Sequence, residues 1–275
     1  MLKWLLPRRI KRVHIYFIVA TLLLGYYYWT RIIRLRSAQS PSFQEVNRTP
    51  KMDIWTARQQ EVVAAFRHSW DGYEKYAWGY DELKPVAKEG SDWFHLGLTI
   101  IDSLDTSYMM GQMDIFQKAR DWTADNLEFK ADVNANVFEI TIRVLGGLLS
   151  AHHLSKDPMF LVKAIELADE LLIAFKSPSE IPYSSVNFLH KKAAEAHFDQ
   201  GASSTSEATT LQLEFKYLTH LTGDPKYWNA CQKAMRSVLK NDRPSGLVPI
   251  FIDAKTGNFA GNNIRLGSRG DSYYG

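Results

Sequence analysis

The sequence predicts an all-α protein built from pairs of antiparallel helices. Apolar residues recur with helical spacing over most of the chain from Ile54 onward. The hexapeptide HLSKDP at 153–158 returns as HLTGDP at 220–225, and MGQMD at 110–114 is a looser version. In each clear copy one helix would end, aspartate would cap the next helix, and proline would occupy its first position. Repeated helical hairpins stack into a solenoid or close into a toroid of inner and outer helices.

Composition and charge narrow the class of protein. The chain has 275 residues, of which 45% are hydrophobic and 23% charged, and this balance is typical of a globular protein with a core. Its basic residues crowd the N-terminus, so nothing indicates a nucleic-acid surface on the remainder. The single cysteine, Cys231, excludes an internal disulfide and is predicted to be a buried structural thiol.

The N-terminal region predicts a membrane anchor. Residues 13–30 read VHIYFIVATLLLGYYYWT, an apolar run just long enough to cross a bilayer, with an aromatic belt at its end. A cleaved signal peptide and a buried soluble helix are the alternatives. The basic residues before the run favour a cytoplasmic tail at 1–12, the span Val13–Thr30, a luminal stem at 31–53 and a catalytic domain at 54–275. The short span favours membranes of the early secretory pathway, and a glycosylation sequon at Asn47 agrees with a luminal stem.

Seven helices and one β-hairpin are predicted within that domain. The hydrophobic pattern places the helices at Trp55–Tyr76, Phe94–Met110, Asp114–Leu127, Asn136–Leu154, Pro158–Phe175, Ser206–Leu221 and Pro225–Leu239. The hairpin is predicted at Leu247–Phe259, where turn residues separate two apolar runs.

The fourth predicted helix carries a polar stripe on an otherwise apolar surface. Glu139, Arg143, Gly146 or Gly147, and Ser150 fall on one side, and the rest of the helix is almost wholly apolar. Such a helix is buried, so the stripe is expected to face a partner or a water-filled cavity. Each glycine weakens the helix by about 1 kcal/mol, which is understandable if something approaches the stripe closely. The alternative is an ordinary Glu–Arg pair worth a few tenths of a kcal/mol.

Other carboxylates and an arginine are predicted at the ends or inner faces of separate hairpins. Asp102 and Asp105 share one helix face, and Glu207 stands at a helix start, where capping is the alternative role. Arg269 precedes Asp271, which is predicted to cap a short helix beginning Ser-Tyr-Tyr. Carboxylates that exchange protons, together with arginines that hold hydroxyls, are typical of a glycosidase cleft. The sequence contains no EF-hand loop, phosphate-binding loop or zinc motif.

Several long segments resemble those of one enzyme family. WDGYEKYAWGYDELKP at 70–85, GLTIIDSLDT at 97–106, NVFEITIRVLGGLLSAHHLS at 136–155, SEATTLQLEF at 206–215 and LGSRGDSYY at 266–274 resemble class I α-1,2-mannosidases of glycoside hydrolase family 47. The resemblance implies an (α/α)7 barrel of which about the first half is present. It also implies calcium dependence and inverting hydrolysis of terminal α-1,2-linked mannose on high-mannose N-glycans, in the endoplasmic reticulum or Golgi.

The resemblance also implies roles for individual residues. Glu139 matches the general acid, and Asp271 matches a second catalytic carboxylate. The mannose-binding cleft is matched by Arg143, Asp102, Glu207 and Arg269. The family's general base and its calcium-binding threonine are expected beyond Gly275, so no metal ligand is predicted here. The alternatives are a glycan-binding or quality-control protein on the same scaffold, and an inactive membrane-anchored remnant.

Overall fold

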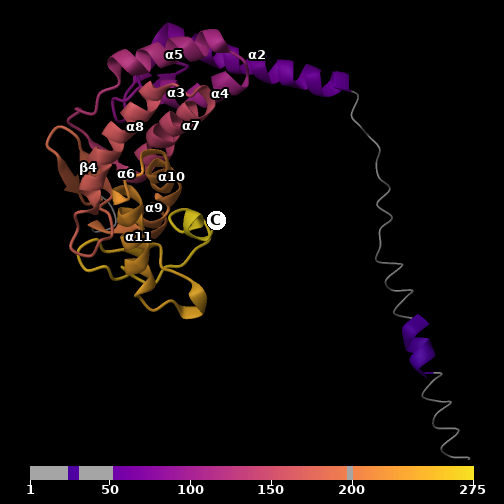
Figure 1. The fold of residues 1–275 in the computed structure, drawn as a ribbon, viewed down its shortest axis with the longest axis vertical. Coiled ribbons are helices and arrows are strands. Elements are labelled where there is room, and N and C mark those ends of the chain that lie inside the picture. The colour runs from indigo at the N-terminus through magenta and orange to yellow at the C-terminus, as the bar shows by residue number, and fades with distance from the viewer. Residues whose placement is uncertain (1–23, 31–51, 197–200) are drawn as a thin grey trace, which may run out of the picture. The chain divides into compact units, whose positions relative to one another are not determined.

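Helices of the chain follow one another as antiparallel pairs joined by tight turns in the computed structural model, which describes residues 24–30, 52–196 and 201–275 (Figure 1). The helices are α2 (Met52–Ala77), α3 (Leu98–Asp102), α4 (Leu104–Met109), α5 (Met113–Asn126), α6 (Val137–Ile140), the π-helical η1 (Thr141–Leu145), α7 (Gly146–Ser155), α8 (Pro158–Leu171), the 3-10 segment η2 (Leu172–Phe175), α9 (Thr205–Thr209), α10 (Gln212–Thr222), α11 (Lys226–Leu239) and α12 (Asp271–Tyr274). Residues 63–275 form one compact unit, and the description below concerns that unit.

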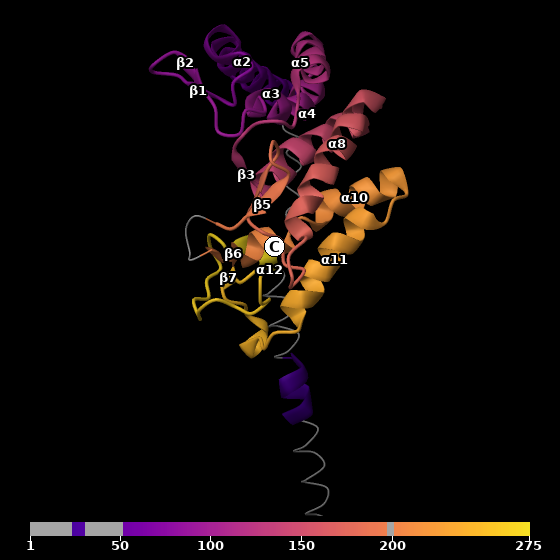
Figure 2. The same ribbon diagram turned by 90° about the vertical axis from the view of Figure 1, so that its left-hand side faces the viewer.

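Short antiparallel strands accompany the helices. They are β1 (Glu82–Lys84), β2 (Glu89–Ser91), β3 (Asn134–Asn136), β4 (Ser185–Asn187), β5 (Lys192–Ala194), β6 (Ser203–Ser204) and β7 (Phe251–Ile252). β1 pairs with β2, β4 lies between β3 and β5, and β6 pairs with β7. The strands gather on one side of the unit, whereas α8, α10 and α11 lie on the other (Figure 2). Because β3 runs directly into α6 and β6 into α9, the starts of these two helices lie on the strand side.

The predicted membrane anchor at 13–30 and stem at 31–53 lie mostly outside the described residues. Residues 24–30, at the end of the predicted span, are helical. Within the described ranges, no helix combines the length and the apolar character that crossing a bilayer requires.

The repeated hexapeptide forms a similar turn twice, but the predicted positions of aspartate and proline hold only in the first copy, because α11 begins at Lys226 with Pro225 at its capping position. Asp157 caps α8 by accepting a hydrogen bond from the Met159 N–H at 2.9 Å, with Pro158 at the first helical position. Asp224 likewise accepts the Lys226 N–H at 2.9 Å at the start of α11. Both turns satisfy N–H groups that the helix itself leaves without a partner.

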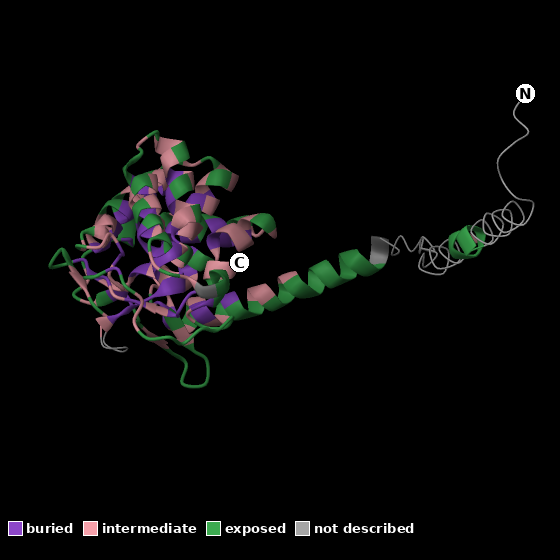
Figure 3. Ribbon diagram, turned by 90° about the horizontal axis from the view of Figure 1, so that it is seen from below, coloured by how far each residue is buried: buried purple, intermediate pink, exposed green. Residues whose placement is uncertain are grey.

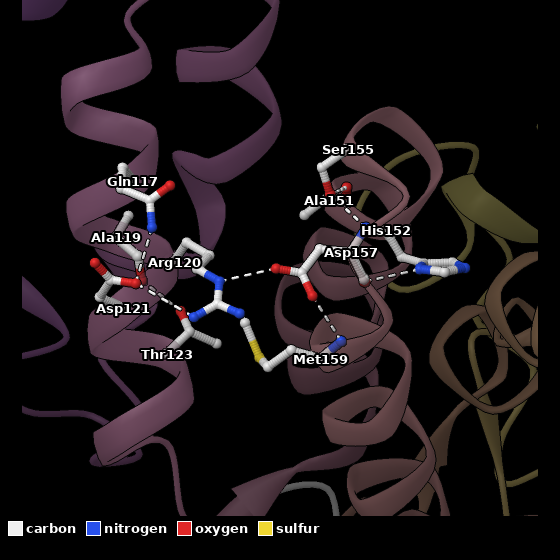
Figure 4. Close-up of polar contacts among 10 residues, drawn as sticks. All are labelled: Gln117, Ala119, Arg120, Asp121, Thr123, Ala151, His152, Ser155, Asp157 and Met159. Atoms are coloured by element: carbon white, nitrogen blue, oxygen red, sulfur yellow. Dashed lines mark hydrogen bonds and ion pairs between the residues drawn. The ribbon is translucent and has the colours of Figure 1, made fainter.

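The first of these two turns is also tied to the preceding hairpin (Figure 4). Arg120 of α5 donates from Nε to Oδ2 of Asp157 at 2.8 Å, and the ring of His152 contacts the Asp157 carbonyl oxygen at 3.0 Å. Burial acts to raise the pKa of the Asp157 carboxyl, but the Arg120 guanidinium and the Met159 N–H together hold it below its ordinary value. A single carboxylate therefore caps one helix and joins two hairpins.

A buried carboxylate shapes the approach to α3. Asp81 is fully buried, and its two oxygens accept hydrogen bonds from the backbone N–H groups of Trp93, Phe94, His95, Leu96 and Leu98. The loop that supplies these donors replaces the start of the helix predicted at Phe94–Met110, which begins instead at Leu98 and is interrupted at Ser103. The predicted start of this helix was wrong because the hydrophobic pattern does not reveal that the loop wraps around Asp81.

The later predicted elements are shorter than expected. The helix predicted at Ser206–Leu221 is split between α9 and α10, where the hydroxyls of Thr209 and Thr210 bond to carbonyls one turn earlier. Such bonds compete with the helical ladder and bend helices. The hairpin predicted at Leu247–Phe259 is present in reduced form, because β7 pairs with β6 and its return arm contributes only the bridge from Ile252 to Phe259.

The hydrophobic core lies between the helices and holds them in place. Its buried side chains come from α2 through α11, and they include the predicted structural thiol of Cys231. Figure 3 shows these buried positions gathered inside residues 63–275, with exposed positions on the outer sides of the helices. Burial raises the pKa of the Cys231 thiol, which agrees with a packing role rather than a reactive one.

Candidate active site

Two of the predicted carboxylates occupy equivalent places at the starts of α6 and α9. The side chain of Asn136 caps α6 by accepting the Glu139 N–H at 2.8 Å. The side chain of Ser204 caps α9 by accepting the Glu207 N–H at 3.3 Å. Each glutamate therefore stands in the first turn of its helix, where the helix dipole favours a negative charge. The caps fix both helix starts, which lie on the strand side of the unit.

The segment that precedes α12 brings a guanidinium and a third carboxylate to the same place. The carbonyl of Arg269 accepts hydrogen bonds from the Ser206 N–H at 3.3 Å and the Ser204 hydroxyl at 3.4 Å. Arg269 has a φ of +72°, a left-handed conformation that costs a non-glycine residue free energy. Its guanidinium carbon lies 5.2 Å from the ring centroid of Phe251. The start of α9 and the Phe251 ring thus hold Arg269 in a strained position.

Four predicted site residues line one cavity of about 300 Å³: Glu139, Glu207, Arg269 and Asp271. The rest of its wall comes from Phe138, Ser206, Ser268 and Ser272. Asp271 is the first residue of α12, with Gly270 at the capping position, so the predicted cap was misplaced by one residue. Its Oδ1 accepts the Ser272 N–H at 3.0 Å. The three carboxylates can exchange protons with a bound sugar. The guanidinium can donate hydrogen bonds to the hydroxyls of that sugar.

Arg143 links this cavity to a second one. Its Nε lies 2.8 Å from Oε2 of Glu139, and its Nη1 lies 3.3 Å from Oδ2 of Asp102. The second cavity, of about 530 Å³, is lined by Asp102, Arg143 and Ser150 among others. Burial raises the pKa of the Asp102 carboxyl, although the adjacent Arg143 offsets part of that effect. Arg143 and Asp102 are the remaining two predicted site residues. Arg143 contacts Glu139 directly, and Asp102 contacts Arg143.

The polar stripe predicted on the fourth helix faces these cavities, but its geometry differs from a plain α-helix. Residues 141–145 form a π-helical turn between Glu139 and Gly146. Single π turns are rare and often occur at functional sites. A Cβ on Gly147 would lie 3.0 Å from the Ile101 carbonyl oxygen, so the expected close approach is made there by the backbone of α3. Gly146 and Ser150 line the larger cavity.

Comparison with known proteins identifies the scaffold. The model of glycosyl hydrolase family 47 matches residues 65–275. The chain belongs to glycosyl hydrolase family 47. This finding confirms the resemblance read from the sequence, and the site described above lies wholly within the matched residues.

Named relatives and a solved structure agree with the family assignment. A mannosyl-oligosaccharide 1,2-alpha-mannosidase from Candida albicans is 50% identical over 222 residues, which are 80% of this chain and 39% of the relative. The endoplasmic reticulum enzyme from Homo sapiens is 47% identical over 79% of this chain and 31% of the relative. The structure of an alpha-1,2-mannosidase from Trichoderma reesei superposes with a TM-score of 0.73 at 31% identity, covering 80% of this chain and 49% of that chain. The present chain thus spans less than half the length of these family 47 relatives.

These relatives also confirm the predicted fold class. The structural match to a family 47 enzyme assigns the helical hairpins to part of an (α/α)7 barrel, with a few small sheets at the start of the hairpins. The predicted roles of the individual side chains are a separate matter, because a family match does not by itself assign them.

Sequence reasoning missed two polar residues beside the family 47 site. Asn136 contacts both glutamates of the smaller cavity, and the pattern of an N-cap residue three positions before Glu139 could have revealed it. Glu214 lines the larger cavity, and within the described part of the chain its Oε2 is buried without a hydrogen-bond partner. Burial raises the pKa of the Glu214 carboxyl. Its place two helical turns after Glu207 was the available signal.

The arrangement of acidic, histidine and cysteine side chains also bears on metal binding. In the ranges 24–30, 52–196 and 201–275, no three His, Cys, Asp or Glu side chains lie close enough to hold a metal ion. Calcium takes six to eight oxygen ligands. These side chains therefore do not form a calcium cage, and no step of the chemistry proposed below passes through calcium.

Proposed function

We propose that the chain is part of an α-1,2-mannosidase that hydrolyses terminal α-1,2-linked mannose from high-mannose N-glycans with inversion. The observation that carries this proposal is the cavity shared by Glu139, Glu207, Arg269 and Asp271. Relatives that are 47–50% identical and carry the name mannosyl-oligosaccharide 1,2-alpha-mannosidase support it.

Glu139 is proposed as the general acid, acting through water on the glycosidic oxygen. It stands at the start of α6 with its side chain 26% exposed, so water and a sugar can reach the carboxyl. Arg143 fixes one of its oxygens from a turn away and leaves the other available. Asp271, which begins α12 and lines the same cavity, is proposed as the second catalytic carboxylate. An inverting glycosidase needs carboxylates on both faces of the scissile bond.

The remaining predicted residues are proposed to bind mannose. Arg269 presents a planar fork of N–H donors that suits neighbouring hydroxyls, and Glu207 supplies acceptors beside it. Asp102 acts further along the same face, where Arg143 holds it. Calcium dependence stays part of the proposal on the basis of the family resemblance.

We also propose that the protein works in the endoplasmic reticulum. Family 47 relatives from Rattus norvegicus, Homo sapiens and Saccharomyces cerevisiae are named endoplasmic reticulum enzymes. The apolar residues 13–30 would anchor the chain as a single span with its catalytic domain in the lumen.

The experiment that tests the function measures mannose release from α-1,2-linked mannobiose by the whole enzyme of which this chain is proposed to be part, with calcium supplied. The wild-type protein is expected to release β-mannose first, seen by proton NMR before mutarotation. Glu139→Gln should lower kcat by at least about a hundredfold, because it removes the general acid. Glu128→Gln is the matched control, since Glu128 is exposed, pairs with the exposed Lys130 and does not line either cavity.

Other outcomes would decide against this proposal. Unchanged turnover in Glu139→Gln would contradict the assignment of the acid. Mannobiose binding without mannose release, at saturating calcium, would favour the alternative of a glycan-binding protein on the same scaffold.

A further inference from the structure

The side chain of Asn136 contacts two residues of the proposed cleft that come from different hairpins. Its Oδ1 accepts the Glu139 N–H at 2.8 Å, and its Nδ2 donates to Oε2 of Glu207 at 3.2 Å. Asn136 is the last residue of β3 and the cap of α6, whereas Glu207 lies in the first turn of α9. One amide therefore joins the starts of two helices that carry proposed functional carboxylates.

We propose that Asn136 is a positioning residue that sets the Glu207 carboxylate in the mannose-binding cleft relative to Glu139. The inference rests on the proposed mannosidase function and deepens it. Asn136 is assigned no contact with the sugar, because it is not among the residues that line either cavity.

The chemistry of the amide explains why asparagine suits this position. Aspartate or serine could also cap α6, but a carboxylate lacks a donor for Glu207, and a hydroxyl is too short to reach both partners. The orientation of the amide is fixed by the same pair of contacts. A flipped amide would point its NH2 group at the Glu139 N–H and its oxygen at the Glu207 carboxylate, and both contacts would be repulsive.

The backbone of Asn136 is held as firmly as its side chain. In the β3–β4 pair, Asn136 stands opposite Ser185, and the next N–H along the chain, that of Val137, donates to the Ser184 carbonyl at 2.9 Å. The side chain therefore starts from a fixed point, and a hydrogen bond from it can restrict where the Glu207 carboxylate lies.

The next hairpin repeats the arrangement with different atoms. Ser204, the cap of α9, accepts the Glu207 N–H with its hydroxyl oxygen and donates that hydroxyl to the Arg269 carbonyl. Each cap thus accepts from its own helix and donates to the following hairpin. This relay runs from Asn136 through Glu207 to the segment that carries Arg269 and Asp271. An ordinary helix cap would need only the acceptor half of the arrangement.

The first test is Asn136→Asp, which keeps the acceptor for the Glu139 N–H and turns the donor into a carboxylate oxygen facing Glu207. We expect kcat/KM for α-1,2-linked mannobiose to fall at least tenfold, mainly through a higher KM, with the melting temperature nearly unchanged. A purely structural cap would instead leave KM unchanged and lower only the active fraction. Asn134→Asp is the control, because it adds the same charge to an exposed position of the same strand.

The second test is a double-mutant cycle with Glu207→Gln. In the double variant the introduced glutamine can donate to the introduced aspartate, so the hydrogen bond returns with its direction reversed. The Asn136→Asp change should therefore cost at least fivefold less in kcat/KM in the Glu207→Gln background than in the wild type. Equal costs in the two backgrounds, with an active wild-type chain, would overturn the inference alone. A wild-type chain that neither binds nor cleaves mannobiose would contradict the proposed function, and the inference with it.

Discussion

Arg143 places its Nε 2.8 Å from the Glu139 carboxylate one turn earlier on the same helix, and its Nη1 reaches Asp102 on another hairpin at 3.3 Å. The guanidinium thus holds an oxygen of the proposed acid and keeps a half-exposed aspartate beside it. Only the rigid fork of arginine can donate in both directions, because a lysine ammonium is a single point charge on a flexible stem.

Arg143→Lys is therefore expected to lower kcat/KM for α-1,2-linked mannobiose by about ten- to a hundredfold, since Glu139 would lose its fixed orientation. Steady-state kinetics check this expectation. Arg120→Lys is the control, because Arg120 also donates to two aspartates but lines neither cavity. Equal losses in the two variants would show that the effect reaches the site through stability.

The adjacent glycines of the stripe should respond to alanine in opposite ways. A Cβ on Gly147 would meet the Ile101 carbonyl oxygen at 3.0 Å, whereas a Cβ on Gly146 would meet nothing closer than 3.6 Å. Gly147→Ala is expected to destabilise the fold by about 1–3 kcal/mol through overpacking. Gly146→Ala should be neutral or stabilise it by up to about 1 kcal/mol, through helix propensity. Urea denaturation of both variants measures the difference, and an equal loss in both would refute the packing argument.

Much of this fold could be predicted from the sequence because the hairpin repeat is a local signal. The Asp-Pro turns, the helical periodicity and the polar stripe all depend on residues close together in the chain. The start of α3 was predicted wrongly because Asp81 accepts hydrogen bonds from N–H groups more than ten residues later in the chain. The break before α10 was missed because the hydroxyl of Thr209 bonds back to the helix. Neither leaves a periodic pattern, so neither could be foreseen.

The candidate site was predictable in its members but not in its contacts. Glu139 and Arg143 stood out because charge on an apolar helix needs a reason. Asn136 did not stand out, because asparagine is common at a helix start. Its second hydrogen bond, which goes to Glu207, joins residues of two different hairpins. Glu214 was missed for a similar reason, since its burial follows from the packing of α7 against α10 rather than from its own neighbours in the chain.

The buried carboxyl of Glu214 should make the stability difference between the wild-type protein and Glu214→Gln depend on pH. Burial raises the pKa of its carboxyl, and Oε2 has no partner within the described residues. Because the folded state holds this proton more tightly than the unfolded state, wild-type stability falls as pH rises from the ordinary glutamate pKa, about 4.3, to the raised value. Glu214→Gln removes that ionisation. Its melting temperature relative to wild type should therefore rise between pH 4 and pH 7. A difference that stays constant with pH would contradict the assignment.

The two repeated caps should differ in strength. Asp157 caps α8 and also accepts from Arg120 of another hairpin, whereas Asp224 accepts the Lys226 N–H at the start of α11 and pairs with the exposed side chain of the same lysine. Asp157→Ala is expected to cost about 2 kcal/mol and Asp224→Ala about 1 kcal/mol. Because the pKa of Asp157 lies below its ordinary value, its extra contribution is complete above about pH 4 and is lost as pH falls below that. Thermal melts at pH 7 and pH 3 test both statements, and equal costs at pH 7 would contradict the role of Arg120.

The residue before each of these caps offers a reciprocal exchange. Lys156 and Gly223 end α7 and α10 in the same left-handed conformation, with φ of +62° and +74°. Glycine adopts this conformation without strain, whereas a side chain adds about 1 kcal/mol. Lys156→Gly should therefore raise the melting temperature by roughly 2–3 °C, and Gly223→Lys should lower it by a similar amount. Calorimetry of both variants measures the pair. The space around Gly223 is open, so a loss there can come only from the backbone. A fall in Lys156→Gly would mean that the lysine side chain contributes more to the turn than its strained backbone costs.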